Sequence, residues 1–208
     1  MLLVDHPDGK VAVAQPAHAW ISGQLARAWA GDVHPWEEVC LAAEQHDVPW
    51  LDWEREPAYD PATGYPYTFM SLDMPTKLAM WRSGPDALLA QSRYAALLVS
   101  LHGSRLYEDL DRSAFEQRQQ ASLDASDEEI ERNHRLVWTW DSMSLALLLD
   151  WRPWTSHDGL RMDPDGRVAP WPFKAGSLTV RCEGRLLTEP GAPLQDAPWV
   201  DLAYELIQ

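Results

Sequence analysis

Cysteine is scarce in this sequence. Cys40 and Cys182 are the only two among 208 residues, and neither belongs to a Cys-x-x-Cys motif. This spacing gives no support to a disulfide framework or to a zinc site built from thiolates. We expect both side chains to be free, partly buried thiols.

Positive charge is also scarce. The chain has 17 Lys and Arg residues against 32 Asp and Glu residues, which gives a net charge of -15, and no cluster of Lys or Arg stands out. The electrostatic surface of a nucleic-acid-binding protein is therefore missing, and we expect no nucleic-acid partner. An acidic surface attracts divalent cations but also favours solubility, so the charge alone assigns no function.

Long hydrophobic runs are absent as well. No stretch of about 18 apolar residues occurs, and the N-terminal segment lacks the basic region and apolar core of a signal peptide. We therefore expect no membrane span and no export, which makes the cytoplasm the expected location. With 46% hydrophobic residues, the chain can bury a sizeable core, and we expect one domain over residues 1–208.

Apolar patterns and turn signals divide the chain into three parts. Residues 1–14 hold two short apolar runs around a Pro-Asp-Gly turn, which predicts a β-hairpin. Residues 15–150 show helical periodicity, whereas residues 151–208 alternate short apolar runs with turn dipeptides and predict a small β subdomain. The expected fold is mainly α, a helical bundle with small β elements at both ends.

Residues that are typical of helix N-termini predict where the helices of this bundle begin. Pro16 suits the start of a first helix, and a second helix is predicted from Pro35 to about His46. Residues 51–73 are rich in proline and aromatic residues without a period, which predicts a long loop. Three later helices have suitable N-cap residues, the last of them in an S-x-x-E capping box: Asp73, Ser92 and Ser126.

Three histidines and two aspartates point to a shared site. His18, His46 and His102 follow the helical spacing of their apolar neighbours, so each faces the core. Asp47 lies about 100° round the helix from His46, near enough for both to reach one ion. Asp141 lies inside the apolar stripe of the last long helix, where an unpaired carboxylate is costly. An arginine or a histidine could pair with it, but a metal ion would also explain the inward-facing histidines.

The order of these residues resembles the H…HD…D pattern of the HD-domain superfamily, whose members are helical and mostly metal-dependent phosphohydrolases. The resemblance implies an HD-domain-like bundle in which one divalent ion (Mn, Fe, Zn or Mg) is held by His18, His46, Asp47 and Asp141. Such an ion lowers the pKa of water toward about 7, and hydrolysis of a small phosphorylated compound would follow. Asp47 and His102 are the candidate catalytic residues, with His102 as a further ligand, a phosphate contact or an acid.

Five runs are similar to an uncharacterised bacterial family catalogued as domain of unknown function 3891, and together they span nearly the whole chain: QPAHAWISGQLARAW, EQHDVPWLDWEREP, YAALLVSLHG, DSMSL and PWPF. This resemblance names no reaction. Similar proteins tend to have the sequence His-Asp-x-Gly-Trp at this point, whereas this chain has Val48-Pro49-Trp50 after the His-Asp pair. Proline in place of a flexible glycine changes the backbone expected just after the pair.

A phosphorylated substrate requires positive charge near the motifs, and the candidate binding residues are Lys77, Arg82 and Arg105. The main alternative function is a non-catalytic module that keeps the HD-like fold and senses a ligand or binds a partner. A minor alternative is an iron oxygenase of the HD type with a second ion at His134. His134 lies about 10 Å along the same helix from Asp141, too far for one ion to bind both.

Overall fold

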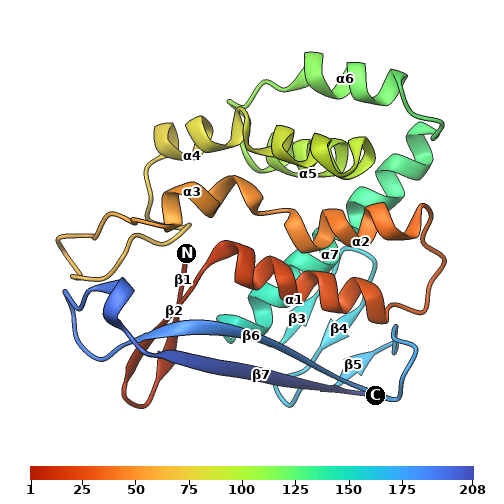
Figure 1. Ribbon diagram of the computed structural model, residues 1–208. Helices are drawn as coiled ribbons and strands as arrows, with labels where there is room; N and C mark the ends of the chain where they lie inside the picture. The colour runs from red at the N-terminus through yellow and green to blue at the C-terminus, as the bar shows by residue number, and fades with distance from the viewer.

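The computed structural model describes residues 1–208 as helices packed against a β-sheet, with a second, smaller sheet beside them (Figure 1). Helix accounts for 45% of the residues and strand for 20%, so the fold is mixed α/β and the prediction of a mainly α fold is wrong. None of the helices combines the length and hydrophobicity needed to cross a membrane.

The larger sheet joins the two ends of the chain. Residues 1–14 form the predicted hairpin, and its second strand pairs antiparallel with a strand near the C-terminus, for example Val11 with Leu186. No local pattern reveals a pairing between strands so far apart in sequence, which is why the two β regions looked like separate small elements. The strand order is β1-β2-β6-β7, with bounds Leu2–His6, Gly9–Val13, Ser177–Leu187 and Trp199–Ile207.

The smaller sheet lies in the region where a β subdomain is predicted. Its strands have two residues each and pair in the order β3-β4-β5: Trp154–Thr155, Arg161–Met162 and Val168–Ala169. Met162 and Val168 are buried and join the main core. This sheet therefore packs on the helices rather than forming a core of its own.

Seven α-helices and three 3-10 helices make up the rest of the regular structure. Asp73, Ser92 and Ser126 each accept a hydrogen bond from the backbone N–H three residues later, which confirms all three predicted N-caps. The α-helices α1 to α7 are Gln15–Ala28, Trp36–Gln45, Leu51–Glu54, Met74–Trp81, Arg93–Leu106, Ser113–Ala121 and Asp127–Leu148. The 3-10 helices η1 to η3 are Val48–Trp50, Gly84–Ala90 and Leu194–Asp196.

The segment after the His-Asp pair is more helical than predicted. Pro49 lies in the first turn of η1, where a proline is tolerated because that backbone N–H needs no helical partner. The helical turn continues into α3, so the start of residues 51–73 is not a loop. Gly84 packs so closely on the Pro49 ring that an added Cβ would lie 2.5 Å from it. The proline is thus accommodated by its neighbour.

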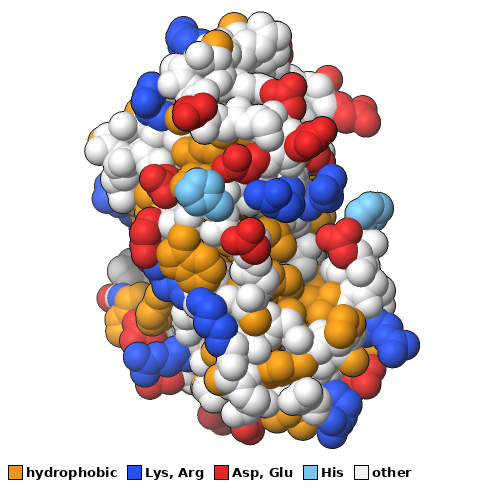
Figure 2. Space-filling view, turned by 90° about the vertical axis from the view of Figure 1, so that its right-hand side faces the viewer, with side chains coloured by type: hydrophobic (Ala, Val, Ile, Leu, Met, Phe, Trp, Pro, Cys, Tyr) orange, Lys and Arg blue, Asp and Glu red, His pale blue; other side chains and the backbone are white.

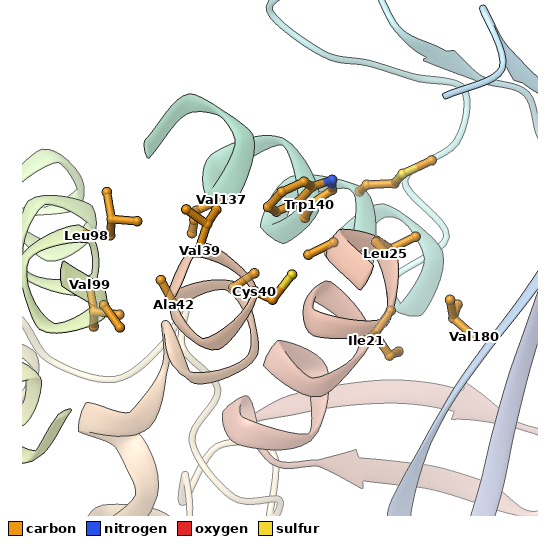
Figure 3. Packing of buried hydrophobic residues seen from close by; sticks show 14 of the residues in the cluster. Ile21, Leu25, Val39, Cys40, Ala42, Leu98, Val99, Val137, Trp140 and Val180 are labelled. Carbon is orange, nitrogen blue, oxygen red and sulfur yellow. The ribbon is translucent and has the colours of Figure 1, made fainter. Parts of the chain in front are cut away.

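The core is organised around α1, which packs on α2, on α7 and on β6 (Figures 1 and 3). Ile21 and Leu25 of α1 lie toward Val180 of β6, while Trp140 of α7 lies over the space between α1 and α2 (Figure 3). Helix α5 covers α2 from the other side and also contacts α7. The inner faces of α1, α2, α5 and α7 therefore converge on one region.

Candidate metal centre

His18 enters this region from the first turn of α1 and is almost fully buried. Its Nε2 atom lies 2.9 Å from Oδ2 of Asp47, and its Nδ1 atom lies 2.6 Å from Oγ of Ser144 on α7. The same face of α1 that buries Ile21 thus carries His18 inward, as the helical spacing predicts.

His46 caps the C-terminal end of α2 and has no exposed surface. Its Nδ1 atom lies 2.9 Å from the carbonyl oxygen of Ala43. Because a carbonyl oxygen only accepts, Nδ1 carries a hydrogen and Nε2 is the atom available to the site. That Nε2 atom lies 3.2 Å from Nε2 of His18 and 3.2 Å from Oδ1 of Asp141.

Asp141 on α7 connects the remaining side chains. Its Oδ1 atom lies 3.5 Å from Nε2 of His18, and its Oδ2 atom lies 3.5 Å from Nε2 of His102 on α5. Asp47 also contacts His46, with Oδ2 3.6 Å from Nε2 of His46. We call these five side chains the His–Asp cluster: His18, His46, Asp47, His102 and Asp141.

The His–Asp cluster contains two overlapping groups that could hold a metal ion, His18–His46–Asp47 and His46–His102–Asp141. Within each group, the candidate ligand atoms all lie within 4.8 Å of one another. Imidazole nitrogen and carboxylate oxygen are ordinary ligands of zinc, manganese and iron. The four predicted ligands therefore lie together, and their chemistry fits a metal ion.

The two buried carboxylates of the cluster require a positive charge beside them. Burial alone lowers the pKa of His46, but the carboxylates of Asp47 and Asp141 outweigh it and raise this pKa to about 9. Burial alone raises the pKa of Asp141, but His46, His102 and His18 bring it well below its ordinary value. In the metal-free protein, a proton on His46 therefore balances the carboxylates, and a bound metal ion would replace that proton.

Two serines orient His18. Ser144 donates its hydroxyl hydrogen to the backbone oxygen of Asp141 at 2.8 Å, so it must accept from Nδ1 of His18. Oγ of Ser22 lies 3.1 Å from Oγ of Ser144 and 3.2 Å from the backbone oxygen of Trp140, and its single hydroxyl hydrogen is shared between these two acceptors. This arrangement leaves the lone pair of His18 Nε2 directed into the cluster. A hydrogen-bonded outer nitrogen is the usual arrangement of a histidine that binds metal.

His102 lacks such a support. Its Nδ1 atom is buried and has no hydrogen-bond partner, and the ring packs between Trp81 and Trp138 with centroid distances of 6.1 and 5.1 Å. Burial lowers the pKa of His102 to about 4, so the ring is neutral near pH 7. The structure thus brings the candidate catalytic residues Asp47 and His102 into one cluster, but the outer nitrogen of His102 has no hydrogen bond and only packing supports that side of the ring.

His134 lies outside the cluster and is committed to another partner. Nη1 of Arg105 donates to Nδ1 of His134 over 2.8 Å, because an arginine only donates. The neutral ring therefore carries its hydrogen on Nε2, and burial, together with the neighbouring His102 and Arg105, keeps the pKa of His134 well below its ordinary value. While Arg105 donates to Nδ1 and Nε2 carries the hydrogen, neither nitrogen of this ring offers a free lone pair to a second ion.

The three candidate substrate-binding cations are not brought together. None of them forms a hydrogen bond or ion pair with the His–Asp cluster; Lys77 is buried on α4, and Arg82 lies exposed at the end of that helix. Arg105 pairs with Glu131 and His134 on α7. On the face shown in Figure 2, Lys and Arg side chains lie among Asp and Glu side chains and form no continuous basic surface.

The cluster is nearly enclosed. His18, His46 and His102 are at most 1% exposed, whereas Asp47 is 4% and Asp141 is 7% exposed. Sequence reasoning did not single out the two residues that shape its α7 side, Ser144 and Trp138. The available signal was their spacing, since each lies three residues from Asp141 and therefore on nearly the same helix face.

The family model described as "Protein of unknown function (DUF3891)" matches residues 1–189, and the chain belongs to that family. No curated protein and no solved structure matches the chain.

Proposed function

We propose that this DUF3891 protein is a metal-dependent phosphohydrolase that acts on a small phosphorylated compound. The observation that carries the proposal is the convergence of His18 from α1, His46 and Asp47 from the end of α2, and Asp141 from α7 in one buried cluster, where two overlapping groups could hold a metal ion. Two of these side chains, His18 and His46, are held through Nδ1 so that Nε2 faces that point. This is the arrangement that metal ligands require.

Each residue has a role in the proposal. His18, His46, Asp47 and Asp141 hold one divalent ion, and the hydrogen bonds of Ser144 and Ala43 keep the two rings in place. When bound, the ion would polarise a phosphoryl oxygen and favour deprotonation of water. His102 is neutral near pH 7 and lies 3.5 Å from Asp141, so its remaining N–H can donate a hydrogen bond to a phosphate oxygen or to the leaving group.

The first experiment measures the metal. Protein purified without added metal should retain about one equivalent of a divalent ion, and a chelator should remove it. Asp141→Asn keeps the size of the side chain but removes its charge, and it should lower the metal content severalfold. Asp124→Asn is the matched control, because Asp124 is exposed and has no ion pair.

The second experiment measures turnover on nucleotides, sugar phosphates and nitrophenyl phosphate. Metal-loaded wild type should hydrolyse at least one of them, and Asp47→Asn should reduce the rate about 100-fold or more, since the charge it loses stabilises the site. Equal rates for wild type and Asp47→Asn would reject the mechanism even if the metal is present.

A second candidate function is a metal-containing module that senses a ligand or binds a partner without turnover. The enclosure of the cluster favours it, because the histidines are at most 1% exposed and a substrate needs access to the ion. A full equivalent of metal together with no hydrolysis of any compound in the panel would support this candidate. The pairing of His134 with Arg105 gives no support to an iron oxygenase with a second ion.

A further inference from the structure

A hollow of about 320 Å³ opens on the surface where α7 meets α5 and the loop around residue 157. We call it the α7 hollow. No member of the His–Asp cluster lines it. Its volume is at the small end of the range for ligand pockets, so it suits a small molecule rather than a chain. Its lining includes Arg105, Glu131, His134, Arg135, Trp138 and Asp158.

Two arginines at this hollow share one carboxylate. Nη1 of Arg105 donates to Oε1 of Glu131 at 3.1 Å, and Nη1 of Arg135 lies 3.5 Å from the same oxygen. The two arginine side chains are 42% and 47% exposed, so both guanidinium groups reach solvent. Each guanidinium has five N–H donors, and one carboxylate cannot satisfy them all. Donors therefore remain free for a second anionic group, which a guanidinium binds in a bidentate manner.

The inner wall of the hollow is aromatic. Trp138 lies with its ring 5.1 Å from the ring of His102 and 6.1 Å from the ring of His134, measured between centroids. His134 is buried and accepts a hydrogen bond from Arg105, so these contacts hold its ring in place. The indole of Trp138 is only partly buried and offers a planar apolar surface. A flat ring in the hollow would stack there.

Asp158 limits the charge of a ligand in the hollow. Asp158 lies exposed on the loop that follows β3 and forms no ion pair. Its carboxylate would repel a second negative group and accept a hydrogen bond from a hydroxyl or an amide. The hollow thus combines free guanidinium donors, a planar wall and one acceptor.

We propose that the α7 hollow binds a small aromatic compound with a single anionic group, a phosphate monoester or a carboxylate. The anionic group contacts Arg135 and Arg105, and the ring stacks on Trp138. The site needs no metal ion, and it stands apart from the proposed hydrolysis because the rings of His134 and Trp138 separate it from the cluster. A ligand bound there would lie against the ring that packs on His102.

Calorimetric titration of metal-free protein tests this proposal with phenyl phosphate and benzoate as probes. Inorganic phosphate and acetate control for the ring, and benzylamine controls for the charge. Phenyl phosphate or benzoate should bind at least tenfold more tightly than its ringless counterpart and than benzylamine, and the tighter of the two identifies the anionic group. Preference for benzylamine, or no heat from either probe at millimolar concentration, would overturn the proposal.

Variants locate the binding. Arg135→Ala should weaken the binding of the preferred probe about tenfold or more, because a charge-assisted hydrogen bond is lost. Arg132→Ala on the same helix is the matched control and should have no effect, since Arg132 is exposed and does not line the hollow. Trp138→Leu should abolish the advantage of the aromatic probes. Arg135 is half exposed, so its variant should fold, and unchanged affinity in Arg135→Ala would refute the site.

Discussion

Raising the pH should destabilise the metal-free protein, because its buried carboxylates depend on a proton. His46 has no exposed surface, and Asp47 and Asp141 hold its pKa at about 9 against an ordinary value of 6.5. A group whose pKa is higher in the folded state than in the unfolded state stabilises the fold fully below the unfolded pKa. That stability is lost as the pH rises from 6.5 to 9.

The expected loss follows from the two pKa values. At about 1.4 kcal/mol per pH unit, the interval from 6.5 to about 9 corresponds to about 3 kcal/mol of unfolding free energy. Two groups act in the opposite direction, His102 and the N-terminal amine of Met1, because burial lowers the pKa of each below its unfolded value. The difference between wild type and a variant without the His46 imidazole therefore isolates the contribution of His46. Burial raises the pKa of Cys40 to about 11, so this thiol costs stability mainly above pH 9. A loss of this size is easily measured, because the unfolding free energy of a typical domain is only about 5–15 kcal/mol in total.

Urea unfolding in the presence of a chelator measures the effect, at pH 6.5, 7.5, 8.5 and 9. His46→Asn is the matched variant: its side-chain amide can still donate to the carbonyl of Ala43, but it has no titrating nitrogen. The variant should be less stable than wild type at pH 6.5, and its unfolding free energy should not show the decrease between pH 6.5 and 9. Metal binding displaces the same proton, so wild-type metal affinity should rise by up to about tenfold per pH unit over this interval.

Two results would refute this reasoning. If the stability of the wild type falls no more steeply between pH 6.5 and 9 than that of His46→Asn, His46 does not carry the balancing proton. A slope that persists in His46→Asn would assign the effect to another group.

Two further predictions concern the surroundings of the cluster. Ser144→Ala should lower metal affinity about 10–100-fold with little change in fold, because Nδ1 of His18 loses its acceptor, and metal titration would detect it; unchanged affinity would contradict the orienting role. Gly103→Ala should destabilise the protein by about 1–3 kcal/mol in urea unfolding, because the new Cβ would lie 2.2 Å from the Trp81 ring. Gly176→Ala, where an added Cβ meets nothing within 4 Å, is its control, and equal stability of the two variants would contradict the packing argument.

Local physical rules explain which parts of the fold could be predicted from the sequence. Helical spacing places His18 and His46 on inward faces because side chains three or four residues apart share one side of a helix. A side-chain oxygen at Ser92 or Ser126 caps a helix wherever the chain goes next. The mainly α prediction was wrong because a strand such as β2 finds its partner, β6, only in the folded protein.

The sequence by itself determined the ligand types of the candidate site, their order and their burial, because each depends on a residue and its near neighbours. Only the tertiary structure decided which atoms meet. The 3.2 Å approach of His46 to Asp141 depends on how α2 packs against α7. The contact of Arg105 with His134 depends on α5 lying beside α7, and it separates one inward-facing histidine from the metal centre. Distances between helices are set by packing over the whole core, which no local pattern contains.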